Sequence, residues 1–177
     1  MNITPRVEVC LKESLRKREL GELCEAAAGA ISNGAGFGWI NPPERERFER
    51  YWRGVLVIPE RSLFVGRLDG VIAGSVQLVS PHAQKEAWSH GCQIDTHFVA
   101  PWARGYGIAR KLMEAVHLQA KKANFRVINL SVRDTQDAAV KLYESLGYIR
   151  WGTNPKYALV DGTLVAGHFY YKSFDRE

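Results

Sequence analysis

The chain has 177 residues, of which 46% are hydrophobic and 24% are charged, and its net charge is +5 at pH 7. This length suits one domain with an ordinary buried core, and we expect residues 1–177 to form it. No apolar stretch approaches the ~20 residues that cross a bilayer, and the N-terminal residues lack the apolar segment of a signal peptide.

The three cysteines are odd in number and lack metal-ligand spacing, so we expect reduced thiols and a cytoplasmic protein. The positive charge is dispersed, because basic residues alternate with acidic ones, as in residues 44–50. Such spacing places ion pairs one helical turn apart. Without a basic block or a reader motif, we expect neither nucleic acid nor membrane as a partner.

The first part of the chain predicts a strand, a helix and a loop. Polar and apolar residues alternate from Arg6 to Leu11, as in a strand, and apolar spacing predicts a helix from about residue 13 to 31. Residues 32–39 contain too many glycines for a helix or a central strand. Phe37 and Trp39 in this loop either line a substrate pocket or pack onto the core.

Asn41-Pro42-Pro43 predicts the start of a second helix, which runs to about Val57. The β-branched residues within 54–58 also permit a strand there. Residues 62–68 and 71–79 are predicted strands, since the Asp69-Gly70 pair between them is a strong hairpin signal. A polar loop at 81–89 leads to a central strand at 93–99.

A glycine turn follows the central strand and precedes a helix that extends to about Ala123. Gly105 and Gly107 allow positive φ angles, so successive backbone amides can point toward one ligand at the positive end of the helix dipole. Such an arrangement favours a phosphate. A P-loop is excluded because Ile108-Ala109 replace the required Lys and Ser or Thr, and a dinucleotide fingerprint because Arg110 replaces its third glycine. An ordinary strand-to-helix turn remains the alternative.

The last third predicts a strand at 125–132, a helix capped by Asp134 or Thr135 and ended by Gly147, and strands at 148–151 and 167–173. We expect a loop from 152 to 166, with turns at Asn154-Pro155 and Asp161-Gly162. This element order predicts an α/β (α+β) fold with a mixed central sheet of six to seven strands flanked by about four helices.

Two motifs resemble one family. The segment Arg104-Gly105-Tyr106-Gly107-Ile108-Ala109 resembles the coenzyme A pyrophosphate loop of the GNAT superfamily of N-acetyltransferases, (Arg/Gln)-x-x-Gly-x-(Gly/Ala). Residues 142–148, Leu-Tyr-Glu-Ser-Leu-Gly-Tyr, resemble its Leu-Tyr-x-x-x-Gly-(Phe/Tyr) signature. Their order and separation, with the element order, extend the resemblance over essentially the whole chain. The last third and the loop at 34–38 resemble more narrowly the tabtoxin-resistance branch.

The resemblance implies acetyl-CoA as cosubstrate. Backbone amides from Arg104 to Ala109 would hold the pyrophosphate, and main-chain atoms of Phe98 and Val99 would pair with the pantetheine arm in a slot where the central strand and the next one splay apart. The family usually has Asn seven places before Tyr143, where it contacts the cofactor. This chain has Gln136 there, whose reach differs.

The implied reaction is acetyl transfer to a primary amine. Tyr143 would protonate the leaving thiolate, or else it is a packed aromatic residue on the apolar stripe of its helix. Many relatives carry a Glu where this chain has Gln93, which cannot accept a proton. Asp95 and His97 are the candidate bases, and without a bulge they share one face of the central strand. The ordinary pKa of His97 would suit neutral pH, although it could also be a core residue.

Phe37, Trp39 and Tyr157 are candidate substrate contacts, as is Trp88, although scattered aromatic residues often belong to the core. No metal site is predicted, because the spacing of His82, His90, Cys92, Asp95 and His97 matches no zinc pattern. We expect a small amine as the acceptor, amino-acid-like or a toxin, and a homodimer as in many GNAT relatives. The alternatives are a coenzyme A sensor without catalysis and an acetyltransferase acting on peptides or proteins.

Overall fold

The computed structural model describes residues 4–35 and 37–175. Met1, Asn2 and Ile3, on which the expectation about a signal peptide rested, and Gly36 of the glycine-rich loop lie outside the described residues. No helix in the described part of the chain is long and apolar enough to cross a membrane.

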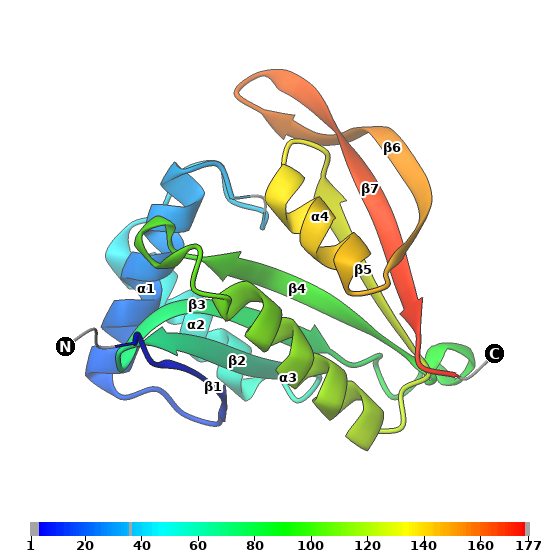
Figure 1. The fold of residues 1–177 in the computed structure, drawn as a ribbon, viewed down its shortest axis with the longest axis horizontal. Helices are drawn as coiled ribbons and strands as arrows, with labels where there is room; N and C mark the ends of the chain where they lie inside the picture. The colour runs from blue at the N-terminus through cyan, green and yellow to red at the C-terminus, as the bar shows by residue number, and fades with distance from the viewer. Residues whose placement is uncertain (1–3, 36, 176–177) are drawn as a thin grey trace.

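The described residues form one mixed sheet with seven strands in the order β1-β2-β3-β4-β5-β7-β6 (Figure 1). Neighbouring strands are antiparallel except for β4 and β5, which are parallel. The predicted order of elements is confirmed. The strands are β1 (Val7–Lys12), β2 (Arg61–Leu68), β3 (Val71–Val79), β4 (Gly91–Val99), β5 (Val127–Arg133), β6 (Ile149–Val160) and β7 (Thr163–Ser173).

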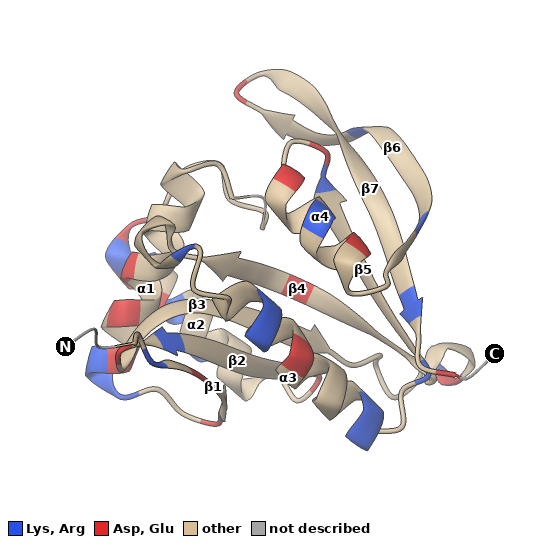
Figure 2. Ribbon diagram, viewed as in Figure 1, with Lys and Arg blue, Asp and Glu red and all other residues tan. Residues whose placement is uncertain are grey.

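Helices cover both faces of the sheet because each carries an apolar stripe. The helices are α1 (Lys17–Ser32), α2 (Arg45–Val57), α3 (Ile108–Lys122) and α4 (Asp137–Ser145), with short 3-10 turns at Glu86–Trp88 and Pro101–Ala103. Buried side chains of α1 and α2 form one core cluster, and those of α3 and α4 form another. Acidic and basic residues are interspersed on α1 and α3 (Figure 2). The expected ion pairs are present, including Arg45 with Glu49 at 2.8 Å.

The start of the first helix and the cap of α4 differ from the sequence prediction. The first helix begins at Lys17 rather than near 13, because the Glu19 carboxylate accepts the Arg16 backbone N–H at 2.9 Å and caps the helix there. The predicted helix end near Val57 is confirmed and the alternative strand at 54–58 is not formed, since Val55 continues the buried stripe of Phe48 and Trp52. This burial outweighs the β preference of a few exposed residues.

Neither Asp134 nor Thr135 caps α4. The residue at the N-cap position is Gln136, which makes no side-chain capping bond. The Asp134 backbone N–H instead donates to the carbonyl of Ala166 at 3.0 Å, because β5 continues its pairing to Arg133. Gly147 does follow the helix with a φ of 82°, as predicted for a C-terminal cap.

The prediction of a loop at 152–166 is wrong, because β6 and β7 form a long hairpin there. Its turn is Asp161-Gly162, with φ angles of 47° and 79°, the backbone geometry that joins antiparallel strands tightly. Asn154-Pro155 lies inside β6, at an irregularity between Asn154 and Ala158. The sheet tolerates a proline there because β6 is an edge strand. Most residues of β6 are exposed, so its sequence lacks the alternation of apolar and polar residues that would predict a strand.

The strands β4 and β5 separate soon after they meet. They pair only between Gly91–Gln93 and Val127–Asn129, and beyond this point the sheet opens into a V (Figure 1). The N-terminus of α3 and the helix α4 lie along one side of the opening. The C-terminal half of β4 therefore has a row of backbone groups that β5 does not pair.

Candidate active site

The glycine turn presents unpaired amides. Gly105 and Gly107 have φ angles of 86° and 79°, which L side chains rarely adopt, and α3 begins at Ile108. Among the described residues, no oxygen accepts a hydrogen bond from the backbone N–H groups of residues 105–110. Open space surrounds both glycines, since nothing lies within 4 Å of where a Cβ would stand. The bend is thus a cluster of free donors at a helix N-terminus.

These donors face a cavity of about 950 Å³ that fills the opening between β4 and β5. The structure brings most of the predicted cofactor residues to its wall. They are Phe98, Val99, Arg104, Gly105, Gly107, Ile108, Ala109 and Gln136. Tyr106 is the exception, because it does not line the cavity and its side chain is exposed.

A bulge in β4 separates the two candidate bases. Gln77 of β3 pairs with Asp95, whereas Ser75 pairs with Phe98, so β4 contains one extra residue between these points. Thr96 has a φ of 48°, a strained value for a β-branched residue. The expectation that Asp95 and His97 share one face is therefore wrong. Asp95 faces α2, and His97 faces α4.

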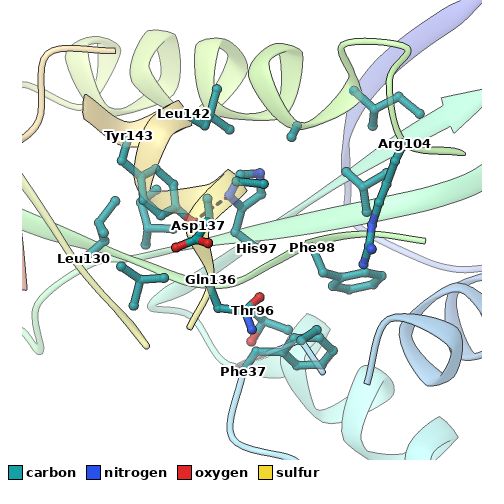
Figure 3. Close-up of a pocket in the computed structure, with 18 of the residues that line it drawn as sticks. Phe37, Thr96, His97, Phe98, Arg104, Leu130, Gln136, Asp137, Leu142 and Tyr143 are labelled. Atoms are coloured by element: carbon teal, nitrogen blue, oxygen red, sulfur yellow. Dashed lines mark hydrogen bonds between the residues drawn. The ribbon is translucent and has the colours of Figure 1, made fainter. Parts of the chain in front are cut away.

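His97 and Tyr143 form a hydrogen-bonded pair at the cavity wall. The Nδ1 atom of His97 lies 2.9 Å from the Tyr143 hydroxyl, and Figure 3 shows the two side chains pointing toward each other. Burial raises the pKa of Tyr143 and lowers the pKa of His97 to about 4. Both groups are therefore neutral at pH 7, and His97 does not titrate near 6.5 as its ordinary value would suggest. Its Nε2 atom is buried without a partner among the described residues.

Asp95 belongs to a polar network beneath the bulge. Arg61 donates to Asp95 at 2.8 Å and also to Gln77, whose amide bonds the Tyr51 hydroxyl at 3.1 Å. Thr96 bonds both Tyr51 and Asp95, at 3.2 Å each. These bonds hold Thr96 in its strained conformation. Asp95 remains accessible from the cavity, because its side chain is 41% exposed.

The loop that precedes α2 closes over one end of the cavity. The Arg104 guanidinium donates to Asn33 at 2.5 Å, and the Gln136 side-chain amide donates to the Gly34 carbonyl at 2.6 Å. The Gln136 amide is therefore bonded to the loop as well as exposed to the cavity. Phe37 stacks on Phe98 with ring centroids 5.0 Å apart, so it serves both the cavity wall and the core.

The remaining aromatic candidates differ in whether they line this cavity. Tyr157 lines the cavity, and its hydroxyl lies 2.8 Å from the Ser131 hydroxyl. Its ring crosses β7 above Gly167, where a Cβ would collide with it. Trp39 packs against Phe48 and Tyr51 and lines a second cavity rather than the first. Trp88 is exposed on the 3-10 turn and lines neither cavity.

Sequence reasoning missed three polar residues, Thr96, Arg61 and Arg133. Nothing in a strand pattern distinguishes a bulge at Thr96, and Arg61 reads as an ordinary polar strand end. Arg133 could have been found, because it ends a strand whose other residues are mostly apolar. It is 7% exposed.

Comparisons with known proteins identify a family for this chain. A family model described as "Acetyltransferase (GNAT) family" matches residues 30–148. An uncharacterized N-acetyltransferase of Azospirillum brasilense, named for the hisH-hisA intergenic region, is 57% identical over 124 residues, covering 70% of this chain and 74% of that protein. The N-acetylaspartate synthetase of Danio rerio is 34% identical over 102 residues, which cover 57% of this chain and 34% of that protein.

Solved structures share the fold at low sequence identity. An N-acetyltransferase from Staphylococcus aureus Mu50 has a TM-score of 0.79 at 18% identity, covering 95% of this chain and 99% of that one. The Salmonella typhimurium protein yncA, determined with its cofactor acetyl-CoA, has a TM-score of 0.75 at 15% identity, covering 96% and 95%.

The fold and the family match define this protein as an acetyltransferase. The chain belongs to the GNAT family of N-acetyltransferases, and acetyl-CoA is its cosubstrate.

Proposed function

We propose that residues 1–177 form a single domain that transfers the acetyl group of acetyl-CoA to a primary amine of a small molecule in the cytoplasm. The observation that carries the proposal is the His97–Tyr143 pair at the wall of the cavity between β4 and β5. The pair lies between the free amides of the glycine bend and the acceptor side of the sheet, where Asp95 and Tyr157 line the same cavity.

The residues present fit acetyl-CoA. The free N–H groups of residues 105–110 supply donors for a pyrophosphate, and Arg104 and Arg110 on the same wall add positive charge. Phe98 and Val99 pair with β3 on one side only, so their main-chain atoms remain available to a pantetheine arm on the other. When bound, acetyl-CoA supplies an activated carbonyl group and a thiolate leaving group.

Tyr143 acts as the general acid in this proposal. Burial keeps its hydroxyl protonated at neutral pH, and the only hydrogen-bond partner of the hydroxyl among the described residues is His97. When Tyr143 gives its proton to the departing sulfur, the Nδ1–H of neutral His97 can donate to the phenolate oxygen. A backbone N–H at Phe98 or Val99 stabilises the negative charge that develops on the carbonyl oxygen.

Asp95 is the base favoured by the geometry. It is accessible from the cavity and faces away from the side that holds the glycine bend, whereas His97 is occupied by Tyr143. The low pKa of His97 also makes its imidazole a poor proton acceptor for an ammonium group. Asp95 receives the proton of the acceptor ammonium, directly or through water, and passes it to solvent.

A small acceptor suits a cavity that two segments of the chain narrow. Asn33 and Gly34 bond Arg104 and Gln136 across the cavity wall, and Tyr157 of the β6–β7 hairpin lines the same cavity. These two segments carry the narrower resemblance to the tabtoxin-resistance branch, which supports an amino-acid-like or toxin amine.

Exposed apolar side chains on the edge strand β6, Ile149 and Trp151, support a homodimer, which sedimentation would test.

The proposal is tested by measuring thiol release from acetyl-CoA with a panel of small amines and of peptides with free N-termini or lysines. We expect turnover with small amines and little with peptides. Turnover restricted to peptides would establish the protein-directed alternative. Tight acetyl-CoA binding without turnover of any amine would establish the sensor.

A further inference from the structure

Arg133 is a largely buried residue whose charge no described residue pairs. It is 7% exposed at the end of β5, yet its guanidinium makes no hydrogen bond or ion pair with any described residue. Arg67 shows how this chain satisfies another well-shielded guanidinium, because it bonds Glu19 and the Gly70 carbonyl. The guanidinium nitrogens are not fully enclosed, so they face the cavity that Arg133 lines. A cation that is largely shielded from solvent and open only to a cavity favours a bound anion there.

The position of Arg133 connects it with the active site. Arg133 lines a second cavity of about 320 Å³, between the loop that ends in Pro42 and the β6–β7 turn. Ala35 lines both cavities, so the two adjoin at the loop. Ser131, which lines the first cavity, precedes Arg133 by two residues on β5 and therefore projects from the same face, about 6.7 Å away along the strand.

We propose that Arg133 binds a carboxylate of the acceptor. The inference rests on the proposed function and narrows its substrate class to amines that carry a carboxylate, such as amino acids. A guanidinium presents a planar pair of donors that matches one carboxylate in a bidentate manner. Asp161 lines the same cavity, which disfavours a doubly charged phosphate more than a singly charged carboxylate. The acceptor amine lies near Asp95, and its carboxylate reaches past Ser131 to Arg133.

The test uses straight-chain amino acids in which the distance between the amine and the carboxylate increases. Each is compared with its methyl ester, which keeps the amine and lacks the negative charge of the carboxylate. The value of kcat/KM is measured by thiol release for the wild type, Arg133→Gln and Arg133→Lys. Arg53→Gln is the matched control, because Arg53 is an exposed residue on α2 that pairs with Glu49. Thermal unfolding of each variant, with and without acceptor, gives a second readout.

We expect the wild type to prefer the free acid at the best chain length and Arg133→Gln to lose about tenfold or more in kcat/KM for it. The same variant should acetylate the ester at the wild-type rate. Arg133→Lys should retain part of the preference, and Arg53→Gln all of it. The unfolding midpoint of Arg133→Gln should not fall, since no partner among the described residues is lost. The acid should raise the midpoint of the wild type and of Arg53→Gln, but not that of Arg133→Gln.

Equal rates with acid and ester in the wild type would overturn the inference and leave the proposed function standing. So would an acid preference that survives in Arg133→Gln. The absence of turnover with every amine would overturn the proposed function and this inference together. A loss of stability in Arg133→Gln, with acid and ester rates falling equally, would show that Arg133 is structural and would also overturn the inference.

Discussion

The glycine bend offers a sharp test, because this chain contains a matched control for its strain. Gly107 and Gly70 have φ angles of 79° and 84°, and at neither residue does any atom lie within 4 Å of where a Cβ would stand. Alanine at either position therefore costs only backbone strain, about 1–2 kcal/mol. For a chain of this size, that should lower the unfolding midpoint by roughly 2–8 °C in both variants.

The two variants should differ in acetyl-CoA binding. Gly107 belongs to the bend whose amides are free, whereas Gly70 lies in the β2–β3 turn and does not line the cavity. If the strained bend relaxes in Gly107→Ala, it turns amides away from the pyrophosphate, and each charge-assisted hydrogen bond lost costs about 1.5–3 kcal/mol. We expect the dissociation constant for acetyl-CoA to rise about tenfold or more in Gly107→Ala.

Calorimetric titration with acetyl-CoA and thermal unfolding of both variants provide the measurement. Gly70→Ala should lose stability and keep wild-type affinity. Equal affinity in the wild type and Gly107→Ala, with the expected loss of stability present, would refute the assignment of the bend as the pyrophosphate site.

Three further predictions concern the cavity wall. Tyr143→Phe should lower kcat by about a hundredfold or more and leave acetyl-CoA affinity unchanged, and a wild-type kcat would exclude the acid role. Asp95→Asn should lower kcat/KM for the amine by about tenfold or more, whereas a wild-type value would assign the base role to water. The third follows from linkage, since burial lowers the pKa of His97 from 6.5 to about 4. The contribution of His97 to the free energy of unfolding is then fully present above pH 6.5. It is lost as the pH falls toward 4, which lowers the free energy of unfolding by on the order of 3 kcal/mol. Denaturant titrations should show a weaker fall in His97→Gln, and an equal fall would contradict this account. His117, whose pKa burial also lowers to about 4, adds to the fall in both proteins.

Local chemistry explains why much of the fold was predictable. The Asp69-Gly70 turn, the start of α3 after Gly107 and the cap at Gly147 each depend on a residue that tolerates positive φ, and such residues are visible in a sequence. The apolar stripes of α1 and α3 depend only on helical periodicity. The sequence did not predict the β6–β7 hairpin because its first strand is an edge strand with little buried surface. Apolar and polar residues alternate with a period of two only where one face of a strand is buried.

The sequence by itself determined the side of the cavity that we propose for acetyl-CoA, because the bend at residues 104–109 and the helix that carries Tyr143 are contiguous segments whose conformations follow from their own residues. Tertiary structure alone decided the side that we propose for the acceptor. The bulge at Thr96 turns Asp95 and His97 to opposite faces, and chain segments distant in sequence bring His97 to Tyr143 and enclose Arg133. Which side chains meet, and which charge remains unpaired, depends on packing between those segments, and no local pattern records it.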